Sequence, residues 1–271
     1  MKQINKYICD HFENDKFSIL GHLKNPKFSI LEYVENSKFS ILGHLENPKF
    51  SIYERLHINK DIGNHSYNYH PKTKDELKEL VNKLIKERGN DADLNDIDTS
   101  EITDMNYMFY TSKFNGDISN WDVRNVKNMH HMFYSSPFNG DISHWDVRNV
   151  EDMTYMFYGS SFNGDISKWD VSNVQYMDYM FAFSEFNGNI SNWDVSNVQY
   201  MDYMFYNSSF NGDISNWDVS NVDSMCYMFF KSSFTAKNGD ISNWNVSNVK
   251  NMDLMFNGTP LETNPPKWYK E

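Results

Sequence analysis

The chain has 271 residues, of which 39% are hydrophobic and 16% aromatic, so it carries enough apolar mass for a sizeable core and does not have the composition of a disordered polymer. Its formal charge of -12 is uneven: residues 90–260 carry 23 acidic and 8 basic side chains, whereas residues 1–89 carry 12 acidic and 15 basic ones. The acidic part repels a phosphate backbone, which argues against nucleic-acid binding. The two cysteines, Cys9 and Cys226, exclude a disulfide framework.

Residues 1–70 show no export signal. MKQINKYICDHFEN has lysines but no apolar segment and no small-residue cleavage site, and no run of about 18 apolar residues occurs anywhere, so we expect no membrane span. Residues 16–59 carry four copies of an 11-residue repeat that begins with KFSI. The alternation in KFSIL favours a strand, whereas Asn25 and Pro26 favour the start of a short helix, and disorder is a third alternative. Residues 1–70 are therefore a separate segment whose structure stays open.

Residues 71–89, PKTKDELKELVNKLIKERG, predict one helix that closes the open end of a stack of repeats. Thr73 and Glu76 match a capping box, and Gly89 supplies the stop. The expected buried stripe consists of Leu77, Leu80, Val81, Leu84 and Ile85.

A 24-residue repeat fills residues 90–260. Its tryptophans stand at Trp121, Trp145, Trp169, Trp193 and Trp217 with a spacing of 24, and at Trp244 after 27. Residues 90–113 are a degenerate first copy, which makes seven rungs. One rung cannot bury its apolar face alone, so we expect stacked rungs to bury each other's. Residues 261–271 are expected to cap the far end, because Pro265 and Pro266 cannot continue a ladder.

Within a rung the hydrophobic period changes. GDISNW follows an Asn-Gly turn signal and predicts a strand of a few residues. Val126, Met129, Met132 and Phe133 then fall within about one third of a helical wheel and predict a short helix. The expected fold class is therefore an α/β repeat, a solenoid of about seven strand-plus-short-helix rungs with an N-terminal capping helix.

Motifs of catalysis are missing from the sequence. No Gly-rich phosphate loop, nucleophile elbow or paired-histidine zinc helix occurs, so we expect no enzyme, no cofactor and no zinc site. Two columns of aspartate recur along the rungs, Asp117, Asp141, Asp165, Asp213 and Asp240 in one and Asp122, Asp146, Asp170, Asp194 and Asp218 in the other. They either accept hydrogen bonds at corners of the coil or bind calcium between rungs, so a calcium-stabilised structural solenoid is the alternative function.

A column of aromatic residues is the candidate binding site. It consists of Tyr107, His131, Tyr155, Tyr179, Tyr203 and Tyr227, with Tyr110, Tyr134, Tyr158 and Tyr206 beside it. These positions fall between two core methionines, on the far side of the expected short helix from Val126 and Met129. The rings either stack between rungs with their hydroxyls in water or form an exposed strip for contact with a protein or glycan, since tyrosine offers a large contact area at a low entropy cost.

The unit F-N-G-D-I-S-x-W-D-V-S-N-V-x-x-M-x-x-M-F resembles the repeat of the BspA-like leucine-rich-repeat proteins of bacterial surfaces, which are frequent in mycoplasmas and host-associated bacteria. The resemblance covers residues 71–268. It implies a right-handed solenoid similar to leucine-rich repeats and a non-catalytic role at a bacterial surface or in host interaction, and it supplies no active-site residues. Residues 1–70 lie outside the resemblance, and this sequence shows neither a signal peptide nor a lipobox.

These observations lead to one functional expectation. The chain should be a non-catalytic repeat protein whose acidic, tyrosine-lined surface contacts a protein or glycan partner, with no role in nucleic-acid binding.

Overall fold

The chain divides into two compact units, Met1–His65 and Ser66–Glu271, and the computed structural model describes residues 67–270. The 11-residue repeats at 16–59 lie outside the described residues. Everything below concerns the second unit taken by itself.

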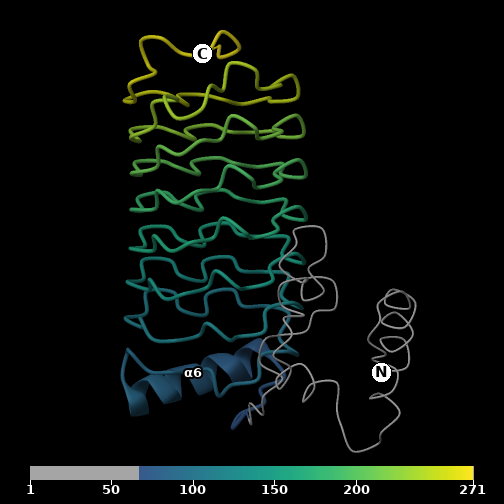
Figure 1. Ribbon diagram of the computed structural model, residues 1–271, viewed down its shortest axis with the longest axis vertical. Helices are drawn as coiled ribbons and strands as arrows, with labels where there is room; N and C mark the ends of the chain where they lie inside the picture. Colours follow the sequence, from purple (N-terminus) through teal and green to yellow (C-terminus); the bar gives the residue numbers. More distant parts are fainter. Residues whose placement is uncertain (1–66, 271) are drawn as a thin grey trace, which may run out of the picture. The chain divides into compact units, whose positions relative to one another are not determined.

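Helix α6, Lys74–Arg88, lies across the N-terminal end of a stack of coils (Figure 1). The Thr73 hydroxyl accepts the Glu76 N–H at 3.2 Å and so satisfies one free donor of the first turn, and the Glu76 carboxylate accepts the N–H of Lys72, just before the helix, at 2.7 Å. Gly89 follows with φ of 96° and donates its N–H to Ile85. The buried residues of the helix, Leu77, Val81 and Leu84, face the first coil, and Leu80 and Ile85 pack beside them.

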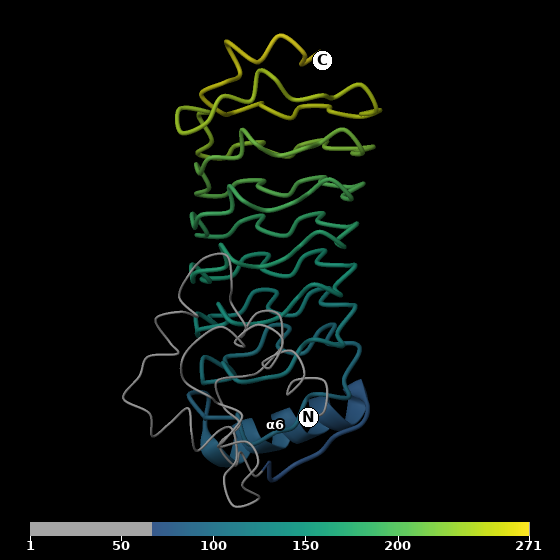
Figure 2. The ribbon, with the colours of Figure 1, turned by 45° about the vertical axis from the view of Figure 1, so that its right-hand side comes forward.

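Seven coils follow α6, joined by one column of parallel β-bridges (Figures 1 and 2). The column runs through Asp104, Asn128, Asp152, Tyr176, Tyr200, Ser224 and Asn251. Next to it, alternate backbone N–H groups of each coil donate to carbonyls of the coil that follows. In the second coil the donors are Met129, His131, Phe133 and Ser135, at 2.7–3.0 Å from the carbonyls of Asp152, Thr154, Met156 and Tyr158. Each coil therefore depends on its neighbours for its backbone hydrogen bonds.

The coils contain neither the short helix nor the short strand that the hydrophobic period predicted. Within residues 67–270 the only helix is α6, and the GDISNW segments run as turns, with a single bridge between Asp93 and Asp117. The expected helix from Val126 is a run of turns, in which Met132 donates to the Met129 carbonyl at 3.1 Å. A helix would have used the N–H of Phe133 internally, whereas here that N–H joins two coils. The leucine-rich-repeat class and the right-handed sense stay predictions.

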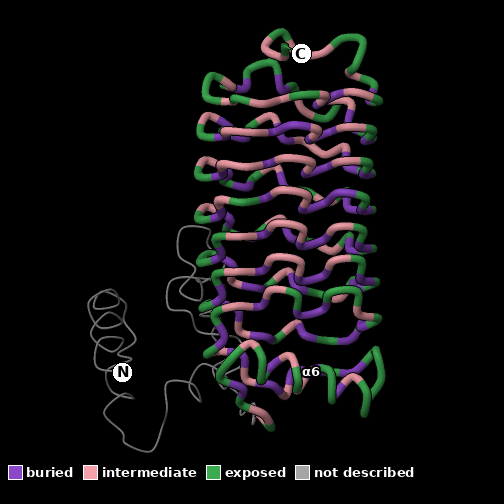
Figure 3. Tube along the Cα trace, turned by 180° about the vertical axis from the view of Figure 1, so that it is seen from behind, coloured by how far each residue is buried: buried purple, intermediate pink, exposed green. Residues whose placement is uncertain are grey.

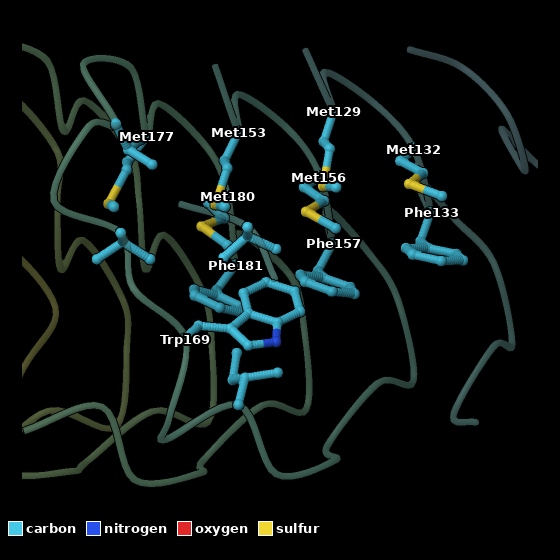
Figure 4. Packing of buried hydrophobic residues seen from close by; sticks show 14 of the residues in the cluster. Met129, Met132, Phe133, Met153, Met156, Phe157, Trp169, Met177, Met180 and Phe181 are labelled. Carbon is cyan, nitrogen blue, oxygen red and sulfur yellow. The ribbon is translucent and has the colours of Figure 1, made fainter. Parts of the chain in front are cut away.

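Buried positions recur from coil to coil along the stack (Figure 3), and the interior consists of columns of identical residues (Figure 4). Phe133, Phe157 and Phe181 stack with ring centroids 5.5 and 5.7 Å apart and planes within 7° of each other. Trp169 lies beneath Phe157 in Figure 4 and donates its indole N–H to the Ile142 carbonyl at 3.0 Å. Equivalent bonds join each tryptophan to the coil before it. The core is therefore apolar and its indole donors are satisfied.

The repeated Asn-Gly pair has a role other than a turn with positive φ. Gly164 does not have a positive φ; a Cβ built there would lie 2.9 Å from the ring of Phe162, so glycine is needed for the close approach of that ring. The preceding residue, Asn163, donates its N–H to the side-chain oxygen of Asn139 at 2.9 Å and accepts the N–H of Asn187 at 2.9 Å. A ladder of asparagine side chains thus fixes the coils at this corner.

Both ends of the stack carry groups that satisfy backbone atoms. Lys78 of α6 donates its ammonium to the carbonyls of Tyr107 and Met108 in the first coil. At the other end the Glu262 carboxylate accepts the N–H of Gly258 at 3.1 Å. Trp268 extends the tryptophan column one step beyond Trp244, with its indole N–H 2.8 Å from the Ile241 carbonyl. Residues 261–270 therefore form a partial eighth coil through Trp268, while their backbone hydrogen bonds stay local and the column of β-bridges ends at Asn251, before the two prolines.

Candidate functional site

Two columns of aromatic rings lie side by side along one face of the stack, and we call them together the aromatic face. The first column contains the predicted residues, Tyr107, His131, Tyr155, Tyr179, Tyr203 and Tyr227. The second column contains Tyr110, Tyr134, Tyr158, Phe183, Tyr206 and Phe230. Rings of the two columns touch within a coil; the centroids of Tyr155 and Tyr158, for example, are 5.6 Å apart.

The first column is a continuous stack of rings. Successive centroids are 4.3–4.7 Å apart and the planes lie within 4–19° of parallel. Tyr107, at the end of the column, is 42% exposed, while the interior rings are half-buried. Since both faces of an interior ring are covered by its neighbours, solvent reaches it only at its edge. The structure thus confirms stacking between rungs and leaves the ring edges as the accessible surface.

Every residue of the first column has a backbone in the left-handed region, with φ of 54–57°. Each occupies the third position of a turn, as His131 does between Met129 and Met132, and that position requires positive φ and favours glycine or asparagine. A bulky residue in this region costs about 1–2 kcal/mol. Stacking of an aromatic pair stabilises by about 0.5–1.5 kcal/mol beyond its area burial, so stacking offsets most of the strain and the buried area of the rings stabilises the stack further.

A second column of positive φ runs four positions further along each coil. It contains Thr111, Ser135, Gly159, Phe183, Asn207, Lys231 and Gly258. The residue type changes from coil to coil here, although the backbone conformation is the same. The first column has a ring in six of its seven positions and Leu254 in the seventh. The constant ring is therefore not a requirement of the left-handed backbone.

The second aromatic column is interrupted at its fourth coil. Ala182 stands where Tyr158 and Tyr206 stand in the neighbouring coils, and it is fully buried. The ring of the next residue, Phe183, fills the gap, with its centroid 5.3 Å from Tyr158 and 5.1 Å from Tyr206. Phe183 is 44% exposed. Sequence columns missed this residue because it is displaced by one position, whereas Phe230 stands one full repeat after Tyr206 and could have been found.

Several ionisable groups lie within or beside the aromatic face. Burial and the adjacent His130 lower the pKa of His131 to about 4, so the ring is neutral at pH 7. Burial and the flanking hydroxyls of Tyr155 and Tyr203 raise the pKa of Tyr179. Burial also raises the pKa of Asp178 to about 6, against the effect of a hydrogen bond from the Asp202 N–H at 2.9 Å. The face is thus made of neutral rings with carboxyl groups next to them.

The two aspartate columns form turns. In the first column the Asp165 carboxylate accepts the N–H of Ser167 at 2.9 Å, and in the second the Asp170 carboxylate accepts the N–H of Ser172 at 3.1 Å. The same bond recurs in the other coils. Of the two roles expected from the sequence, this is hydrogen-bond acceptance at corners of the coil, because a carboxylate readily accepts the N–H of the residue two positions later. Among residues 67–270 no group of three His, Cys, Asp or Glu side chains is arranged to hold a metal ion.

The fold and the face together define a repeat protein whose identical coils display a regular surface. A family model described as "Mycoplasma protein of unknown function, DUF285" matches residues 76–184 and again residues 160–268, and the chain belongs to this family. No curated protein and no solved structure shows a significant match to the chain. No helix of the described residues is long and apolar enough to cross a membrane.

Proposed function

We propose that residues 67–270 are a non-catalytic binding unit whose aromatic face contacts a partner protein. The observation that carries this proposal is the difference between the two columns of positive φ. One accepts any side chain, and the other has an aromatic ring in six consecutive coils. The same left-handed φ carries Thr, Ser, Asn, Lys or Gly in the second column of positive φ, so the backbone conformation does not account for the constant ring, whose edge stays accessible to a partner.

The geometry of the rings favours a protein over a glycan. A sugar binds an aromatic side chain through the face of the ring, and neighbouring rings cover these faces in the first column. Ring edges and tyrosine hydroxyls suit the amides and mixed side chains of a protein surface, where tyrosine is enriched. The ladder geometry repeats at every coil, so a long partner segment would meet the same groups several times.

Within residues 67–270 the repeated polar side chains are spread along the stack, which supports a non-catalytic role for this part of the chain. Each coil repeats its side chains along a line, and a catalytic site requires a nucleophile, a base and an orienting group at one point. A place at a bacterial surface, which the family resemblance implies, is tested by fractionation of the cells that make the protein. Recovery of the chain in the cytosolic fraction alone would refute a location at the bacterial surface without affecting the proposed binding role.

The binding role is tested with a photo-crosslinking amino acid at position 179. We expect a protein to be captured there and not from Asn192, an exposed residue outside the aromatic face. Once purified, the captured protein should bind the parent chain about tenfold more tightly than it binds a Tyr179→Phe, Tyr203→Phe variant. This variant keeps the stacked rings and loses two hydroxyls. Equal capture at both positions, or equal affinity for both chains, would refute the proposal. Binding of a purified polysaccharide in place of a protein would do the same.

A further inference from the structure

The aromatic face changes its character at the fourth and fifth coils, residues 162–209. The first column is unbroken there, but the second has the buried Ala182 and the displaced ring of Phe183, a pair that we call the stack break. Phe183 is the most exposed large apolar side chain of the described residues. It also has φ of 56° in a column where glycine and asparagine occur in other coils.

The ring of Phe183 is turned relative to its neighbours. Its plane makes angles of 60° with Tyr158 and 56° with Tyr206. By contrast, Tyr134 and Tyr158 lie within 2° of parallel, as do Tyr206 and Phe230. No parallel ring therefore covers Phe183, which is 44% exposed. An uncovered aromatic face attracts a cation within about 6 Å of the ring centroid.

The charge of the same two coils is strongly one-sided. Residues 162–209 contain six acidic side chains and one basic side chain, Lys168. Residues 114–161 and residues 210–260 contain three basic side chains each. Of the six acids, Asp178 and Asp202 each precede a tyrosine of the first column, and Glu185 stands two residues after Phe183. The part of the aromatic face with an uncovered ring is therefore also the part with the fewest positive charges.

We propose that the stack break anchors an arginine side chain from a basic segment of the partner protein. This inference rests on the proposed function and names the chemistry of its partner. A guanidinium group is planar, lies flat on an aromatic ring and at the same time donates hydrogen bonds to carboxylates in its plane. The turned ring of Phe183 supplies the surface, and the acidic side chains of the same two coils, among them Asp178, Asp202 and Glu185, supply the negative charge. A lysine ammonium matches this combination less well, because it is a compact and strongly hydrated charge.

The test uses the full chain and an oligoarginine peptide as probe, with binding measured by fluorescence anisotropy at low and at physiological salt. We expect Phe183→Gly to weaken oligoarginine binding about tenfold. Glycine is tolerated at this φ, so the variant should fold. The matched control is Lys231→Gly, two coils further along the same backbone column, which should bind oligoarginine as tightly as the parent chain or more tightly. Added salt should weaken binding, and an Asp178→Asn, Glu185→Gln variant should lose most of that salt dependence.

Several results would overturn the inference. Failure of oligoarginine to bind the parent chain is one, and equal weakening by Phe183→Gly and Lys231→Gly is another. Oligolysine that binds as tightly as oligoarginine would exclude the arginine assignment, and preferential binding of a polyanion such as heparin would exclude a basic partner. In one outcome oligoarginine fails to bind, while the protein captured at position 179 still binds the parent chain more tightly than the Tyr179→Phe, Tyr203→Phe variant. In that case the arginine anchor is wrong and the proposed function stands.

Discussion

Replacement of Trp169 by alanine is expected to cost about 4 kcal/mol of unfolding free energy, within the range of about 3–5 kcal/mol for loss of a buried tryptophan that leaves a cavity. The indole is 4% exposed, it lies beneath the Phe157 ring, and its N–H bonds the buried carbonyl of Ile142 at 3.0 Å. The carbonyl that loses its donor adds to the cost because it stays buried. The coils on both sides of Trp169 lose packing contacts, so we do not expect the stack to fill the cavity by repacking.

Trp169→Phe separates the two contributions. Phenylalanine keeps most of the apolar volume and chiefly removes the donor, so it should cost about 1–3 kcal/mol. Urea unfolding followed by far-UV circular dichroism measures both variants, and the slope against urea should not change. Trp268→Ala is the control, because that side chain is only half-buried in the last, partial coil. An alanine variant as stable as the parent, or a phenylalanine variant as unstable as alanine, would refute the packing described for this column.

Further expectations concern pH, backbone strain and calcium. The pKa of Asp178 is raised to about 6, above its ordinary 3.8, so its ionisation opposes folding as pH rises through 6, and Asp178→Asn should raise the melting temperature at pH 8 and leave it unchanged at pH 4. The pKa of His131 is lowered to about 4 from 6.5, so the stability from its neutral ring is present above pH 6.5 and is lost as pH falls toward 4; His131→Phe should flatten that loss in pH-dependent calorimetry. Lys231→Gly should stabilise the fold by about 0.5 kcal/mol in urea unfolding, because φ is 54° there. Millimolar calcium or EGTA should leave the melting temperature unchanged, since the aspartate columns accept turn N–H groups, and a clear rise with calcium would restore the alternative of a calcium-stabilised solenoid.

Repetition made the architecture readable from the sequence, because one buried column implies the others. The constant step of the repeat located the core residues Trp169 and Phe157, and the capping box located the start of the helix at Thr73. The backbone conformation within a coil could not be predicted in the same way. The spacing of Met129, Met132 and Phe133 suits a helix and a run of turns equally, and only hydrogen bonds between successive coils, which are distant in the sequence, decide between them.

The sequence placed the rings of the candidate site in one column, which the structure shows as a stack, but it did not predict how far the rings are buried. The rings of Tyr179 and Tyr203 are half-buried in a stack, so changing both to serine should lower stability as well as affect binding. No sequence signal predicts a left-handed backbone conformation at a tyrosine, since glycine or asparagine is the usual residue at a turn position with positive φ. The ring of Phe183 could not be predicted from the sequence either, because the repeat spacing places Ala182 in the second aromatic column at that coil.

Most of the backbone hydrogen bonds between coils point the same way, which gives the stack an electrical polarity. A few bonds run the other way, as from the Glu151 N–H to the Lys127 carbonyl, but next to the bridge column four N–H groups of each of the first six coils point toward the C-terminal end and the carbonyls point back. Their peptide dipoles add along the stack as they do along a helix axis, but with the positive end at the C-terminus. The Lys78 ammonium at one end and the Glu262 carboxylate at the other have the signs that this arrangement attracts. Insertion or deletion of whole coils would lengthen or shorten the dipole while leaving its two counter-charges in place, so the number of coils can vary without a redesign of either end.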